Sequence, residues 1–119
     1  MAVDEEVRSA IDSHLLPRPN TASRRQFGGV CYMVQGKMFA TLMEGVVAMK
    51  LPDQLRQTAL TLAGVSPFRA PGGGPFGQWI QFVILLDDDV PSVLPWLEAS
   101  SDYVDSLPAR SKRRRKASP

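Results

Sequence analysis

The chain has 119 residues and a formal net charge of +2, and its length suits one domain with a single core. The charge is uneven, because residues 110–116 hold six of the 14 basic residues and leave 8 basic and 12 acidic residues, a net −4, over residues 1–109. The single cysteine excludes an internal disulfide, the acidic start is unlike a secretory signal peptide, and no apolar run approaches the roughly 20 residues of a membrane-spanning helix. We therefore expect a cytoplasmic protein without a membrane partner.

Residues 3–15 have the spacing of an amphipathic helix. Their apolar side chains recur at intervals of three and four: Val3, Val7, Ala10, Ile11 and Leu15. The acidic residues 4–6 favour the positive N-terminal end of such a helix. Pro17 is expected to end it, because proline lacks a backbone N–H and disfavours helical backbone in the residue before it.

Gln35-Gly36 separates two apolar runs, residues 30–34 and 38–42. A polar pair that ends in glycine suits the two-residue turn of a β-hairpin, which needs positive φ. Gly45 then separates the second run from the β-branched stretch 46–51, for which we expect a third strand. The three strands would form a meander.

Pro52 and Asp53 are predicted to begin a second helix, and Gly64 to end it as a left-handed cap. The inward face of this helix would consist of Leu55, Ala59, Leu62 and Ala63. Residues 66–77 are rich in glycine and proline, so we expect a loop there with a short edge strand at Phe68.

Residues 79–86 are predicted to form a strand because their apolar side chains suit a half-buried sheet. Alternation would direct one almost wholly apolar set toward the core: Ile80, Phe82, Ile84 and Leu86.

Residues 93–107 have helical apolar spacing, and prolines constrain where this helix begins. With Ser92 as N-cap, Pro95 costs no helix bond, whereas a start at Asp89 would place it inside the helix at a cost of about 3 kcal/mol. We therefore expect the helix to begin near Val93. Residues 109–119 have no apolar periodicity and are expected to be a disordered basic tail.

These elements predict a small α+β domain over residues 1–108. Its antiparallel sheet would hold a β-meander and one or two further strands, and its helices would be N-terminal, middle and C-terminal. The expected order is α-β-β-β-α-(β)-β-α.

Two segments make the chain resemble the N-terminal domain of the TfoX/Sxy family, namely Phe27-Gly28-Gly29 and Gly36-Lys37-Met38-Phe39-Ala40. The resemblance covers about residues 4–108. It implies a small α+β domain with an antiparallel sheet, found in bacterial proteins of which some regulate DNA-uptake competence. Such regulators carry a second, helical domain that this sequence does not show, so we expect a stand-alone N-terminal domain.

Residue types that suit catalysis or metal binding have structural explanations here. Cys31 lies in an apolar strand, where a thiol behaves as a small hydrophobe. His14 is the one histidine, and we expect it near the end of the first helix in a surface or capping role, since a metal site needs several convergent ligands. Gly72-Gly73-Gly74 leads into a strand and so differs from a phosphate loop, and Asp87-Asp88-Asp89 is interpreted as a solvated turn. We predict no catalytic residue, no metal site and no cofactor.

Arg24 and Arg25 precede the glycine pair at the head of the predicted hairpin, where alternation would direct them to opposite faces of the sheet. Two interpretations stay open for them: pairing with the acidic first helix, or contact with an anion or a partner.

The basic end has the charge pattern of a nucleic-acid contact. Its residues are Arg110, Lys112, Arg113, Arg114, Arg115 and Lys116. No aromatic residue is interleaved, so the pattern favours non-specific contact, with a solubilising or recognition tail as the other interpretation.

The sequence thus predicts a non-enzymatic regulatory or protein-interaction module with a protein partner. A nucleic-acid-associated accessory protein that acts through its basic tail is the alternative hypothesis, and a homodimer through an exposed sheet edge stays open.

Overall fold

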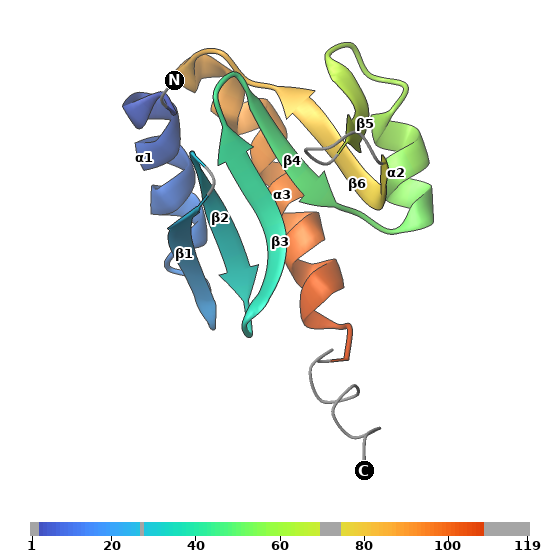
Figure 1. The fold of residues 1–119 in the computed structure, drawn as a ribbon, viewed down its shortest axis with the longest axis horizontal. Coiled ribbons are helices and arrows are strands. Elements are labelled where there is room, and N and C mark those ends of the chain that lie inside the picture. Colours follow the sequence, from blue (N-terminus) through green and yellow to red (C-terminus); the bar gives the residue numbers. More distant parts are fainter. Residues whose placement is uncertain (1–2, 27, 70–74, 109–119) are drawn as a thin grey trace.

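The computed structural model of the chain describes residues 3–26, 28–69 and 75–108, and it contains one six-stranded antiparallel sheet with the strand order β1-β2-β3-β4-β6-β5 (Figure 1). The elements in chain order are α1 (Glu5–Leu15), β1 (Thr21–Gln26), β2 (Gly29–Val34), β3 (Lys37–Met43), β4 (Val46–Lys50), α2 (Asp53–Ala59), β5 (Val65–Arg69), β6 (Pro75–Val83), the short 3-10 helix η1 (Asp87–Asp89) and α3 (Val90–Asp105). The predicted α+β class with an antiparallel sheet is confirmed.

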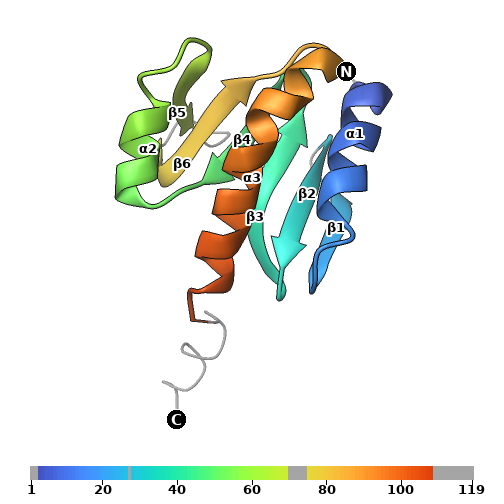
Figure 2. The ribbon, with the colours of Figure 1, turned by 180° about the vertical axis from the view of Figure 1, so that it is seen from behind.

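The helices α1 and α3 lie over the same face of the sheet, as the two opposite views show (Figures 1 and 2). Ala59 of α2 belongs to the same buried cluster as the inward residues of α1 and α3, so α2 covers this face too. The cluster includes Ile11, Tyr32, Phe39, Met49, Ile80 and Leu97. Within the described ranges no helix covers the opposite face, which we call the open face.

The register of the sheet places one row of residues across the open face. It consists of Arg24, Cys31, Thr41, Ala48 and Gln81, each paired with the next across neighbouring strands. Cys31 and Ala48 are buried within this row although neither belongs to the core cluster. The side chains at the centre of the open face are therefore small and mostly apolar, and the β1 edge of this face is basic.

The predicted hairpin is confirmed, with Val34 paired to Lys37 across the turn. Gln35 and Gly36 have φ of 54° and 77°, as a two-residue turn with two left-handed positions requires. The predicted first helix is confirmed as well, and Asp4 caps it by accepting hydrogen bonds from the backbone N–H groups of Glu6 and Val7.

The first strand, β1, was not expected from the sequence. It pairs with β2 antiparallel over its whole length, from Thr21 opposite Val34 to Gln26 opposite Gly29. Its residues are mostly polar because an edge strand has a neighbour on one side only and contributes little to the core.

The predicted extent of the second helix is wrong, since α2 ends at Ala59 rather than near Ala63. Beyond Ala59 the backbone tightens into turns, with the Thr61 N–H bonded to the Thr58 carbonyl, and Leu62 is 44% exposed. Gly64 has the expected positive φ of 80°, but it ends this turn and leads directly into β5.

The short edge strand expected at Phe68 is confirmed, since Phe68 lies in β5 at one edge of the sheet. The extent of the loop predicted over residues 66–77 is wrong, because β5 and β6 extend into it from both sides. Of the predicted core face, Ile80, Phe82 and Ile84 are buried, whereas Leu86 is 60% exposed. The strand ends before Leu86 because the Asp89 carboxylate accepts hydrogen bonds from the N–H groups of Leu85 and Leu86 and turns the chain. The acidic triplet is thus a 3-10 helix with a capping role and not simply a solvated turn.

The predicted start of the last helix is wrong, since α3 begins at Val90 and Pro95 lies inside it. The earlier start adds Val90 to the buried residues of the helix. Burial of one valine side chain contributes about 1.5–3 kcal/mol, which offsets much of the roughly 3 kcal/mol that an interior proline costs. Ser92 is not the N-cap, and its hydroxyl donates to the Asp89 carbonyl in the first turn.

Candidate functional site

The two arginines of β1 lie on opposite faces of the sheet, as alternation predicts. Arg25 points to the helix-covered face, where its Nη2 lies 3.5 Å from Glu5 Oε2 of α1. Arg24 is opposite Cys31 on the open face and is exposed. Pairing with the acidic helix is therefore observed for Arg25 and not for Arg24, and contact of either arginine with a partner stays a prediction.

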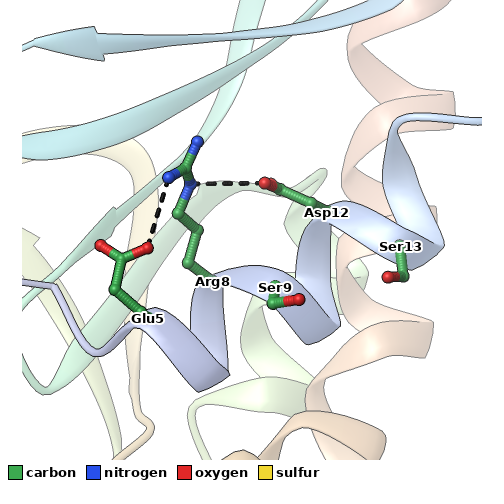
Figure 3. Close-up of a pocket in the computed structure, with 5 residues that line it drawn as sticks. All are labelled: Glu5, Arg8, Ser9, Asp12 and Ser13. Carbon is green, nitrogen blue, oxygen red and sulfur yellow. Dashed lines mark hydrogen bonds and ion pairs between the residues drawn. The ribbon is translucent and has the colours of Figure 1, made fainter.

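A set of side chains linked by hydrogen bonds and an ion pair joins α1 to the sheet. The Tyr32 hydroxyl donates to Asp12 Oδ1 at 2.7 Å, and Arg8 Nε lies 3.3 Å from Asp12 Oδ2. Arg8 also reaches Glu5 Oε1 through Nη1 at 3.4 Å (Figure 3). Burial raises the pKa of Tyr32 well above its usual range, and the hydrogen bond to Asp12 and the negative charge of Asp12 raise it further. The hydroxyl therefore stays protonated and serves as a structural donor.

A histidine–carboxylate contact and an ion pair join α1 and the turn after it to α3. His14 Nε2 contacts Glu98 Oε2, and Arg18 Nη2 lies 2.8 Å from Asp102 Oδ1. Each pair joins residues 84 positions apart in the chain. The sequence predicted a surface or capping role for His14 and gave no sign of Glu98, because only the packing of α1 against α3 brings the two together.

Cys31 and His14 do not form a catalytic pair. Cys31 is buried on the open face with its Sγ 3.7 Å from Thr41 Oγ1, while His14 lies on α1 behind the other face. The sheet separates the thiol from the imidazole. The structural interpretation of Cys31 as a small apolar residue agrees with its burial.

Shallow hollows lie along α1 and α2. The first, of about 430 Å³, is lined by Glu5, Arg8, Ser9, Asp12 and Ser13 (Figure 3). The second, of about 590 Å³, is lined by Gln54, Leu55, Gln57, Thr58 and Thr61. Each is an open depression on one helix, and in the first the charged groups of Arg8 and Asp12 already pair with each other.

The described ranges contain no group of three or more His, Cys, Asp or Glu side chains that could hold a metal ion. None of the helices they include is long and apolar enough to cross a membrane. Phe27, Gly72-Gly73-Gly74 and the predicted tail residues from Arg110 to Lys116 lie outside the described residues.

Gly29, the first residue of β2, allows a close backbone approach to β3. A Cβ on Gly29 would lie 2.4 Å from the Leu42 carbonyl oxygen of β3. Gly28 has φ of 78°, a value that favours glycine. Gly28 is not crowded, since nothing lies within 4 Å of where its Cβ would be.

The two edges of the sheet differ. In β5 the middle residue is Pro67, and the pairing with β6 shifts register between Pro67 and Arg69. Proline removes a backbone donor and an irregular register bends the strand, and both features hinder the addition of a further strand. The pairing of β1 with β2 has neither feature, so β1 presents a regular edge. Sequence reasoning missed this edge because it missed β1.

The sequence model of the TfoX N-terminal domain matches residues 13–103, from the last turn of α1 to the last turn of α3. A search of curated proteins found no match.

Proposed function

Because the chain belongs to the TfoX N-terminal domain family, we propose that it is a regulatory protein-interaction module of bacterial type and not an enzyme. The proposal rests on one observation: among the described residues, the side chains best suited to catalysis are paired with neighbouring side chains or buried. Asp12, Arg8 and His14 are engaged in pairs that join the helices to the sheet and to each other. Cys31, the single cysteine, is buried on the far side of the sheet from His14. Within the described ranges, β1 lies at an edge of the sheet, pairs regularly with β2 and has no neighbouring strand on its other side.

Affinity capture of the tagged full chain at its endogenous level tests the proposal. A specific protein partner is the expected result. The proposal is lost if capture recovers no specific partner while the purified chain turns over a substrate. In that event, activity that survives both Cys31→Ala and His14→Ala would place the reaction at other residues.

A second candidate is a nucleic-acid-associated accessory protein that acts through the basic end. It is favoured by the five consecutive basic residues from Lys112 to Lys116. If these neutralise about five phosphates, the affinity should fall steeply as the salt concentration rises. A shift assay with the full chain and a chain truncated after Pro108 decides between the candidates: equal binding by both, or no binding at about 50 mM salt, removes this one.

A further inference from the structure

Free backbone groups line the outer side of β1. The Gln35 N–H donates to the Asn20 carbonyl, and these two residues continue the register in which Thr21 is opposite Val34. In an antiparallel pair, every second residue turns its N–H and C=O toward the neighbouring strand. Ala22, Arg24 and Gln26 therefore bond to β2, and the backbone groups of Thr21, Ser23 and Arg25 point outward.

The charge at this edge is positive and partly uncompensated. Of the arginines whose side chains the structure describes, Arg24 alone has no recorded ion pair or hydrogen bond. Arg25 is already engaged by Glu5 on the helix-covered face. An arriving segment would therefore meet a free guanidinium on the open face and a row of unpaired backbone groups along the edge.

We propose that the β1 edge binds an extended acidic segment of a partner protein, which pairs with β1 as an additional strand and places a carboxylate against Arg24. This inference rests on the proposed interaction function and specifies its surface and the chemistry of its partner. Main-chain hydrogen bonds would supply much of the affinity in this mode, and the Arg24 contact would supply selectivity for acidic residues.

Charge complementarity argues against two other occupants. The basic end of this chain has six basic residues within residues 110–116 and would be repelled by the arginines of β1. A second copy of β1 would bring Arg24 and Arg25 of both copies to one junction. Neither occupant supplies the negative charge that Arg24 lacks.

Two peptides of about six residues, blocked at both ends, serve as probes. One alternates valine and glutamate, and the other alternates valine and lysine. Binding to the full chain is measured by calorimetry, and backbone hydrogen exchange is followed residue by residue by NMR. The glutamate peptide should bind more tightly, and it should slow exchange at the amides of Thr21, Ser23 and Arg25. Exchange at Ala22 and Arg24 should change little, because those amides are already bonded to β2.

Three variants locate the contact. Ser23→Pro removes an outward N–H without removing a bond to β2, and it should weaken binding of the glutamate peptide at least about fivefold. Arg24→Ala should weaken it by about tenfold, since a charge-assisted hydrogen bond is lost. Arg56→Ala is the control, because Arg56 lies on α2, which packs against β6 and not β1, and its side chain pairs with Asp53; it should change the affinity less than about twofold.

Several results would overturn the proposal. They are no binding of the glutamate peptide, equal binding of the two peptides, or slowed exchange at amides other than the outward three. If exchange at the amides of Thr21, Ser23 and Arg25 is already slow without peptide, and sedimentation shows a dimer, the edge is occupied by a second copy of the chain. If the Ser23→Pro chain still captures the same cellular partner with unchanged affinity, the edge is excluded while the proposed interaction function stands.

Discussion

The hydroxyl of Tyr32 on β2 donates a 2.7 Å hydrogen bond to the carboxylate of Asp12 on α1. Tyr32 is fully buried, so this bond fixes the position of the first helix on the sheet from inside the core. Arg8 forms an ion pair with the other oxygen of the same carboxylate, so Asp12 links Arg8 of α1 to Tyr32 of the sheet.

Tyr32→Phe should lower the free energy of unfolding by about 1–2 kcal/mol, because it leaves a half-buried carboxylate without its donor. Urea denaturation measures the change. Tyr103→Phe is the matched control, since no hydrogen bond of its hydroxyl occurs in the described part of the chain, and it should change the free energy by less than about 0.5 kcal/mol. Equal effects of the two variants would mean that the Tyr32 bond does not stabilise the fold.

Phe39→Ala should cost about 3–5 kcal/mol, because Phe39 is fully buried in the core cluster between the sheet and the helices. Thermal and chemical denaturation measure the loss. Leu85→Ala removes a side chain that is 62% exposed and should stay within about 0.5 kcal/mol of the parent. An unchanged midpoint for Phe39→Ala would contradict its placement in the core.

Gly29→Ala should destabilise the protein more than Gly36→Ala. The new Cβ at position 29 meets a backbone oxygen that cannot move without disturbing β3, and a cost of at least about 2 kcal/mol is expected. At position 36 no atom lies within 4 Å, and only the left-handed backbone opposes the substitution, at about 1 kcal/mol. The reverse order in denaturation experiments would show that the contact between β2 and β3 is looser than described.

Pro95→Ala should stabilise the protein by about 1–2 kcal/mol. The substitution restores a helix hydrogen bond inside α3, and the greater freedom of the unfolded chain reduces the gain. Pro91→Ala is the control, because Pro91 lies at the start of α3, where the N–H has no partner within the helix, and it should have no stabilising effect. A loss of stability in Pro95→Ala would point to a packing role for the exposed ring.

The parts of the fold that were predictable are those encoded by nearby residues. The turn at Gln35-Gly36, the helical stripe of Val7, Ile11 and Leu15, and the burial of alternate residues in β6 all follow from short-range patterns. The domain class followed from these segments and from the resemblance that they carry.

The parts that were missed depend on neighbours distant in sequence. Strand β1 forms because β2 is available to pair with it, and its own polar residues give no signal. The early start of α3 depends on the burial of Val90 by other elements, which a local rule about Pro95 does not include. The contact of His14 with Glu98 spans 84 positions and has no local pattern at all.

Pro67 limits how far this sheet can grow. With β5 interrupted by a proline and a register shift, pairing can continue from β1 alone. A sheet with one edge available for pairing forms a closed complex once that edge is occupied, either by another protein or by a second copy of the chain. Open-ended filaments require two available edges. Pro67 and the register shift beside it therefore disfavour them.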